Sequence, residues 1–325
     1  MSTGQPEPLV SVILPTYNSA GGLSTAIASI LRQTYTGLEL IIVDDGSTDA
    51  TGEVLAGFTD PRITVIRHPG NYGVARAYNT GVGAARGSFI GFIGSGDEWL
   101  PEKLAEAVSW FSGLSPEYGV VYSDLWEITR SGERKYWQNP TITGPELINR
   151  AGTDYQVNLL GNGAVLVRRE YLDRAGDFDE QFRSFSDTDM IIRLQRLCRF
   201  HHIKKPLYIY HSNQGLSSSP VGVSLARLLL LKKYPEGTLN PVFLQHQHDL
   251  IRDSIRLAGM DAGQPGRRYA HEPAAGSISQ NLFRLLDERV IRRICPAGSR
   301  RNRFYVQGLA AARKYLNPLL VSRRW

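Results

Sequence analysis

Short runs of apolar residues alternate, over residues 1–220, with stretches in which apolar residues recur at helical spacing. The apolar runs are Leu9–Leu14, Leu40–Val43, Ile63–Ile66 and Ser88–Ile93. Runs without polar alternation are typical of strands covered on both faces of a parallel sheet. The helical stretches are one with Leu23, Ile27, Ile30 and Leu31, one near Thr51–Gly57, one at Val74–Ala85 and one that Pro101 opens. This order predicts an α/β fold with a mostly parallel, Rossmann-like sheet, flanked by helices and joined by right-handed crossovers.

The alternation continues less regularly between residues 118 and 211. We expect strands at Tyr118–Leu125 and Gly163–Val167, helices at Glu170–Ala175 and from Asp187 onward, and an extended segment at Phe200–Ile209. Between the two strands, Glu127–Asn158 is expected to form loops and short elements around the site of a second substrate, the acceptor. Residues 1–220 are therefore predicted to form one nucleotide-binding domain.

The composition changes in residues 221–325, which we predict to be a helical, basic C-terminal appendage. Helices are expected at Pro241–Leu257, Asn281–Ile294 and Phe304–Leu316, with a Gly-, Ala- and Pro-rich linker at Gly259–Ser277. Two interpretations of the last helix stay open: it rests on an anionic bilayer, or it packs on the protein's own body with its arginines in solvent. The same region is a candidate for acceptor or oligomer contacts.

The distribution of charge and the cysteine content exclude several classes of function. Residues 291–325 hold nine Lys and Arg and no acid, which leaves 28 basic against 31 acidic residues in the rest of the chain. The body therefore lacks the basic face that a nucleic-acid-binding protein needs. Cys198 and Cys295 lie far apart without metal-ligand spacing, which argues against a zinc site and indicates a reducing compartment. With no secretory signal and no apolar run of about 18 residues, we expect a cytoplasmic protein.

The most informative stretch is Leu38–Asp49, in which an apolar run ends abruptly in two carboxylates and a Gly-Ser-Thr turn. Asp44 and Asp45 follow the last strand residue, and ligands of open α/β sheets bind at the carboxyl ends of strands. These carboxylates can accept hydrogen bonds from a base N–H and from ribose hydroxyls. The alternative is that the stretch is a turn that caps the next helix, because Asp, Gly and Ser are ordinary turn residues.

A series of motifs extends this observation along the chain. They are Val12–Asn18 (VILPTYN), Val43–Asp49 (VDDGSTD), Asn71-Tyr72-Gly73 with Arg76 and Asn79, Phe92–Leu104, Val167-Arg168-Arg169, Gly176–Asp179 (GDFD) and Ser186–Asp189 with Arg193. In this order they resemble the family 2 glycosyltransferases of GT-A fold, which are inverting enzymes that use nucleotide-activated sugars. The resemblance covers about residues 9–218 and makes residues 1–220 a GT-A catalytic domain.

The resemblance implies roles for particular residues of this chain. It assigns donor binding to Pro15, Thr16, Tyr17, Asp44, Asp45, Asn71, Arg76, Ser95 and Gly96. It makes Asp187 the general base that deprotonates the acceptor hydroxyl, with Asp189 and Arg193 in support. Two alternatives remain open, namely that Asp187 caps its helix and that Arg76 is a solvated charge.

One departure from the family concerns the metal ion. Family members usually carry an Asp-x-Asp or Asp-Asp cluster that holds the divalent ion bridging the donor diphosphate. This chain has Gly94-Ser95-Gly96-Asp97, so glycine replaces two of the usual carboxylates. Asp97, with Glu98 beside it and His211 further along, is left to bind Mn²⁺ or Mg²⁺. The alternatives are that Asp97 caps the helix near Pro101 and that His211 is an exposed loop residue.

From these features we expect an inverting transferase that moves a sugar from a nucleotide-diphosphate donor, UDP- or dTDP-linked, to a hydroxyl of a glycan or a lipid-linked glycan in polysaccharide assembly. It would be cytoplasmic, and contact of its tail with the inner face of the membrane is one of the two interpretations left open above. One rival is a non-catalytic sugar-nucleotide-binding or scaffold protein with a degenerate metal motif. The other is a nucleic-acid or membrane adaptor that acts through the tail.

Overall fold

The computed structural model describes residues 7–129, 131–142 and 162–212, together with residues 226, 229, 230, 233 and 234. The chain divides into two units, Met1–Ser218 and Ser219–Trp325. The helices and linker expected beyond residue 240 lie outside the described residues, as does most of the expected acceptor segment. No helix in the described ranges has the length and apolar character needed to cross a membrane.

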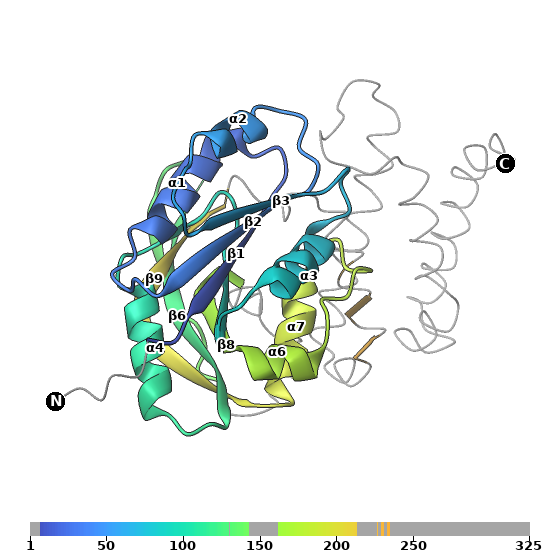
Figure 1. The fold of residues 1–325 in the computed structure, drawn as a ribbon. Coiled ribbons are helices and arrows are strands. Elements are labelled where there is room, and N and C mark those ends of the chain that lie inside the picture. The colour runs from blue at the N-terminus through green and yellow to red at the C-terminus, as the bar shows by residue number, and fades with distance from the viewer. Residues whose placement is uncertain are drawn as a thin grey trace, which may run out of the picture. The chain divides into compact units, whose positions relative to one another are not determined.

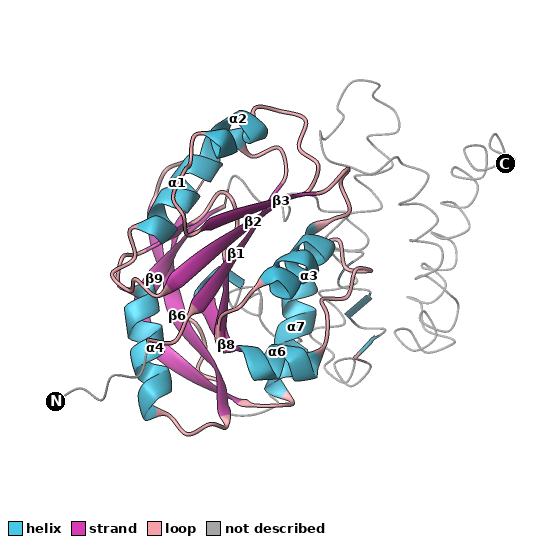
Figure 2. Cartoon of the chain, in the orientation of Figure 1, coloured by secondary structure: helices cyan, strands magenta, loops and turns pink. Residues whose placement is uncertain are grey.

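A single sheet forms the centre of the first unit (Figures 1 and 2). Its strands are β1 (Val10–Thr16), β2 (Leu38–Asp44), β3 (Ile63–Arg67), β4 (Phe89–Phe92), β5 (Glu98–Trp99), β6 (Tyr118–Ile128), β7 (Arg134–Trp137), β8 (Val165–Arg168) and β9 (Arg199–His211). They lie in the order β3-β2-β1-β4-β8-β6-β9-β5, with β7 paired to β6. Strands β3, β2, β1 and β4 are parallel, whereas β8, β7 and β5 run antiparallel to their neighbours. The sheet is thus parallel where the first four strands were expected and mixed beyond them.

Helices cover both faces of this sheet. The helices are α1 (Ala20–Leu31), α2 (Thr51–Ala56), α3 (Val74–Ala84), α4 (Lys103–Gly113), α6 (Arg169–Ala175) and α7 (Ser186–Gln195). One hydrophobic core joins α1, α2 and α4 to the sheet, and a second joins α3, α6 and α7 to the opposite face. Successive residues of β2 alternate between the cores, since Leu40 and Ile42 face the first and Ile41 and Val43 the second. This two-sided burial explains the run of consecutive apolar residues.

Besides the short strand β5, which was not expected, three elements differ from the sequence-based expectation. Strand β1 continues through Pro15 to Thr16 instead of closing at Leu14, because Pro15 lies past the last residue of β1 that pairs with β4 and so removes no hydrogen bond from that ladder. Strand β6 extends to Ile128 and forms a hairpin with β7 inside the stretch expected to be loops. All four residues of β7 are exposed, so its sequence has no alternation of buried apolar and exposed polar residues that would predict a strand.

Candidate active site

The carboxyl ends of β1, β2 and β4 lie side by side at one edge of the sheet. Thr16 pairs with Asp44 in the β1–β2 register, and Ile13 pairs with Phe92 in the β1–β4 register. The turn at 94–97 follows β4 directly, so it lies at the same edge as Thr16 and Asp44. Open α/β sheets bind their ligands at this edge.

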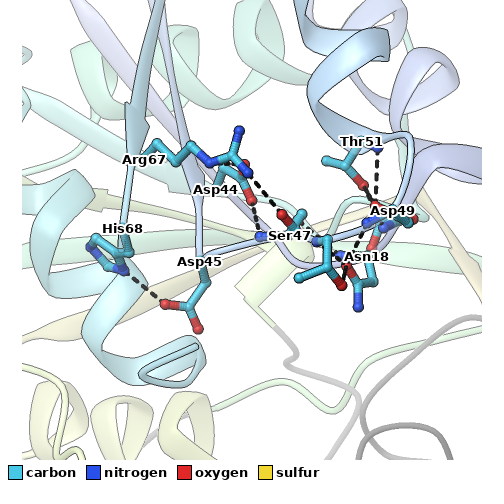
Figure 3. A network of polar contacts seen from close by, with 10 residues as sticks. Asn18, Asp44, Asp45, Ser47, Asp49, Thr51, Arg67 and His68 are labelled. Atoms are coloured by element: carbon cyan, nitrogen blue, oxygen red, sulfur yellow. Dashed lines mark hydrogen bonds and ion pairs between the residues drawn. The ribbon is translucent and has the colours of Figure 1, made fainter. Parts of the chain in front are cut away.

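Asp44 is buried and builds the turn that follows β2 (Figure 3). Its Oδ1 accepts the Ser47 N–H at 2.9 Å, and its Oδ2 lies 3.5 Å from the Arg67 guanidinium. Arg67 also donates to the Ser47 carbonyl at 2.8 Å. Gly46 has φ +77°, and a Cβ there would come within 2.6 Å of the Gly70 backbone. Only glycine tolerates both this positive φ and the lack of room for a Cβ. Glycine at this position therefore allows the loops after β2 and β3 to lie in contact.

Asp45 is also buried, and both of its oxygens accept hydrogen bonds from the loop before α3. Oδ1 accepts the Tyr72 N–H at 3.0 Å and lies 2.7 Å from His68 Nδ1, while Oδ2 accepts the Gly73 N–H at 2.7 Å. Figure 3 shows Asp45 turned toward His68 and away from the Asp44 and Ser47 turn. Asp45 therefore fixes the point at which α3 begins.

Thr16 is the exception among these buried groups. Its side chain is buried, yet Oγ1 has no hydrogen-bond partner within the described chain. Pro15 and Tyr17, on either side, are half-buried. An unsatisfied buried hydroxyl costs free energy unless a ligand or water completes it, so it marks a place where a ligand can bind.

Two further residues expected to bind the donor lie on the rim of this edge. Asn71 is exposed. The Arg76 guanidinium lies 4.6 Å from the centroid of the Tyr72 ring and 3.9 Å from Glu180 Oε2, with about half of its side chain exposed. The contact with Glu180 connects the first turn of α3 to the loop that precedes α7. Arg183 of that loop lies near Gly73, since a Cβ on Gly73 would be 3.8 Å from Arg183 Nη1.

Helix α7 therefore starts at the same end of the molecule as α3, close to the carboxyl edge of the sheet. Asp187 lies in its first turn, is half-buried, and accepts the Thr188 N–H at 2.8 Å. The preceding N-cap residue, Phe185, has φ +61°, a strained conformation for a bulky side chain. Strain of this kind concentrates at functional sites. Because the N-cap is Phe185, Asp187 is not the capping residue of this helix.

Asp189 and Arg193 form an ion pair within α7. Asp189 is fully buried and lies 2.9 Å from Arg193 Nη2. Arg193 also donates to the carbonyls of Ala175, Gly176 and Asp177, at the end of α6. These contacts hold α7 against the end of α6.

The structure brings the three expected metal ligands together through the pairing of β5 with β9. Asp97 Oδ2 accepts the Tyr208 hydroxyl at 2.7 Å, and Oδ1 accepts the His211 N–H at 3.1 Å. Burial raises the pKa of Asp97 to about 6, although the hydrogen bonds from Tyr208 and His211 act in the opposite direction. The His211 ring pairs with Glu98, with 3.1 Å between Nε2 and Oε1. Asp97 does not cap α4, whose N-cap is Glu102.

These residues do not fit a Mn²⁺ or Mg²⁺ site. In nucleotide sites such ions are usually held by one or two carboxylates, with waters and substrate phosphates at the other positions, so at least one carboxylate must be available to the ion. The described residues contain no group of three His, Cys, Asp or Glu side chains placed to hold an ion. Asp97 directs both oxygens at β9, and a Cβ on Gly94 would come within 2.8 Å of Oδ2, so the carboxylate occupies the space that glycine leaves. Only Glu98 and His211 remain, and they bind each other.

Two buried charged residues, Lys103 and Asp124, were not singled out from the sequence. Lys103 is buried and donates to the Ala164 carbonyl at 2.8 Å. Asp124 is fully buried and accepts from Tyr136 Oη at 2.7 Å and from the Asn139 N–H at 2.8 Å, and it lies 2.6 Å from His202 Nε2. A charged residue inside an apolar stretch, as Asp124 is in β6, is the sequence signal that could have found it.

Comparison with known proteins gives a consistent result. The model of glycosyl transferase family 2 matches residues 11–176. The chain is 31% identical over 217 residues to the uncharacterized glycosyltransferase EpsJ of Bacillus subtilis, a match that covers 63% of this chain and 62% of EpsJ. It is 28% identical over 216 residues to the succinoglycan biosynthesis protein ExoO of Rhizobium meliloti, covering 64% and 62%. The matches thus span less than two thirds of these relatives.

Two solved structures share the fold. Staphylococcus aureus TarS 1-349, in complex with UDP-GlcNAc, superposes with a TM-score of 0.58 at 20% identity, covering 88% of this chain and 83% of that one. The mannosyltransferase PcManGT of Pyrobaculum calidifontis, in complex with GDP-Man and Mn²⁺, gives 0.53 at 19% identity, covering 96% and 88%. Both are GT-A glycosyltransferases, and the GT-A fold expected from the sequence is confirmed.

Proposed function

The chain belongs to glycosyl transferase family 2, and on that premise we propose that it transfers a sugar, with inversion, from a nucleotide-diphosphate donor to a hydroxyl of a growing glycan. Its relatives include proteins of polysaccharide biosynthesis. One of them, Escherichia coli WfgD, is named as a glucosyltransferase acting on a diphosphoundecaprenol-linked GlcNAc and is 41% identical over 101 residues, covering 31% of this chain and 40% of that protein. A free or lipid-linked glycan is the acceptor we propose, with the basic residues 291–325 in contact with the membrane surface.

The observation that carries the proposal is the unsatisfied Thr16 hydroxyl at the carboxyl edge. Thr16 is level with Asp44 in the β1–β2 register, and every other polar group described above at the ends of β1 and β2 is already bound within the chain. A ligand that presents hydrogen-bonding atoms at this point, as a nucleoside diphosphate does, would complete the hydroxyl. Asp44 and Asp45 fix the two loops that flank it.

Asp187 is the residue we propose as general base. As the acceptor oxygen attacks the anomeric carbon, its proton passes to the Asp187 carboxylate. The bond from that carbon to the donor phosphate breaks on the opposite face, and the electron pair leaves with the nucleoside diphosphate. One displacement of this kind inverts the configuration. Asp189 and Arg193 hold the first turn of α7 in place for this step.

The proposal is tested by assaying the protein with UDP-, dTDP- and GDP-sugars and a panel of glycan acceptors, with release of nucleoside diphosphate as the readout. Wild type should turn over one donor, and NMR of the product should show the inverted anomer. Asp187→Asn should lose about 10²- to 10⁴-fold in turnover while binding the nucleotide as before. Asp173→Asn, a matched change at an exposed carboxylate on α6, should keep full turnover.

Two outcomes would contradict the proposal. Equal turnover by Asp187→Asn and wild type would remove the residue from catalysis. Nucleotide binding without turnover of any donor would favour the non-catalytic sugar-nucleotide-binding protein instead.

A further inference from the structure

The turn Gly94-Ser95-Gly96 lies at the candidate site and offers unused hydrogen-bond donors. All three residues are half-buried. The turn closes with the Asp97 N–H donating to the Gly94 carbonyl at 3.1 Å. Within the described chain, neither the N–H of Ser95 nor that of Gly96 has an acceptor, and the Ser95 hydroxyl has none. Partly buried N–H groups in folded proteins are normally bonded, so water or a ligand takes this place.

The turn lies at the same edge of the sheet as the Thr16 hydroxyl of β1, which has no hydrogen-bond partner among the described residues. Strands β1 and β4 are parallel, and Ile13 pairs with Phe92. Thr16, three residues further along β1, and the turn that begins at Gly94 both follow that pair, so both lie at the carboxyl edge of these two strands. Among the described residues, a buried hydroxyl without a partner and two N–H groups without acceptors thus lie at this edge.

Glycine at 94 and 96 removes the carboxylates that would repel an anion here. The remaining carboxylate, Asp97, is held from β9 by the Tyr208 hydroxyl and the His211 N–H. It lies behind Gly94, whose missing Cβ leaves it room. Of the residues of this turn, only Asp97 carries a carboxylate, and both of its oxygens accept hydrogen bonds from β9.

We propose that the Gly94-Ser95-Gly96 turn binds the donor diphosphate directly, through the N–H groups of Ser95 and Gly96 and the Ser95 hydroxyl, with no divalent ion between the protein and the phosphates. Glycine-rich turns bind phosphate oxygens in this way, because the absence of side chains lets the ligand approach the backbone. The inference rests on the proposed function, since it concerns the donor of the same reaction. In this proposal the direct contact takes the role of the Mn²⁺ or Mg²⁺ ion expected from the family resemblance.

Calorimetric titration of the full chain with UDP, dTDP and GDP, in EDTA and in Mn²⁺, tests the proposal directly. The nucleotide that binds should show the same Kd in both buffers within about two-fold. A loss of about ten-fold or more in EDTA would overturn the direct contact and leave the transferase proposal standing. Failure of all three nucleotides to bind in either buffer would instead count against the proposed function as well.

A matched pair of variants gives the inference a second test. Gly96→Asp introduces a carboxylate at the turn, so nucleotide binding should weaken in EDTA and recover when Mn²⁺ is added. Gly96→Asn has the same size without the charge, so any weakening should not respond to Mn²⁺. Equal Mn²⁺ dependence in wild type and Gly96→Asp would refute the proposal. Should the variants fail to fold in a thermal melt, the wild-type titrations alone decide.

Discussion

Lys103 is a cation in an apolar interior, and its removal should stabilise the protein at neutral pH. The residue is 2% exposed, with its Nζ donating to the Ala164 carbonyl and lying 5.2 Å from the Trp99 ring centroid. Burial lowers the pKa of Lys103 from 10.5 to about 7. A methionine of similar length would fill the space without the charge, at the loss of one hydrogen bond.

The direction of the pH dependence follows from whether Lys103 binds its proton in the folded and in the unfolded state. Between about pH 7 and pH 10.5 the unfolded chain holds the Lys103 proton and the folded chain does not. The free energy of unfolding should therefore rise with pH across this window, by about 1.4 kcal/mol per pH unit. Below pH 7 Lys103 is protonated in both the folded and the unfolded state. The folded state then carries the full cost of burying the charge, about 5 kcal/mol at most. Loss of the carbonyl hydrogen bond offsets about 1 kcal/mol of the gain in Lys103→Met.

Urea unfolding followed by tryptophan fluorescence, at pH 7.0 and pH 8.5, measures this contribution. Wild type should gain about 1.5 to 2 kcal/mol more than Lys103→Met between the two pH values. At pH 7.0 the variant should be more stable than wild type by about 2 to 4 kcal/mol. A variant less stable than wild type at pH 7.0, with the same pH slope, would show that Lys103 is a solvated or well-paired cation and would refute the reasoning.

Three further predictions concern the edge of the sheet and its supports. Thr16→Val removes a buried hydroxyl without a partner, so the free energy of unfolding should rise by about 1 kcal/mol in urea titrations while nucleotide affinity falls in calorimetry; a parallel fall of both would contradict this. Asp189→Asn leaves the Arg193 guanidinium without its carboxylate, so stability should fall by about 3 kcal/mol in the same titrations, and an unchanged midpoint would show that the pair does not hold α7. Asp124→Asn should cost a similar amount and weaken the β6–β7 hairpin, as seen in faster amide exchange of residues 134–137.

The sequence predicted the strands that consist of consecutive apolar residues and missed β7, which has no such run. Strand β2 was recognisable because Leu40, Ile41, Ile42 and Val43 all lie in a core. Strand β7 carries no such signal, since its four exposed residues owe their conformation to pairing with β6. Its existence depends on tertiary contacts, which a single stretch of sequence does not show.

The positions of the site residues could be predicted, but not their hydrogen-bond partners. Asp45 was expected at the edge of the sheet because it ends a buried run, and it lies there. That its oxygens accept from residues 72 and 73 depends on where the loop after β3 lies. Asp97 is likewise held by Tyr208, which is 111 residues away in the chain. Spacing in the sequence carries no information about contacts of this range.

The partners explain which kind of ligand the edge can bind. The carboxylates of Asp44, Asp45 and Asp97 are acceptors, and each is already bonded to N–H or O–H groups of the chain. At the end of β1 and in the turn after β4, the groups without a partner among the described residues are the Ser95 and Gly96 N–H groups and the Thr16 hydroxyl, which can donate as well as accept. A diphosphate offers acceptor oxygens and negative charge and no donor. The ends of β1 and β2 and the turn after β4, which use the carboxylates of Asp44, Asp45 and Asp97 internally and keep donors free, are therefore matched to the phosphates of a nucleotide sugar, and these three carboxylates leave little for a metal ion to bind.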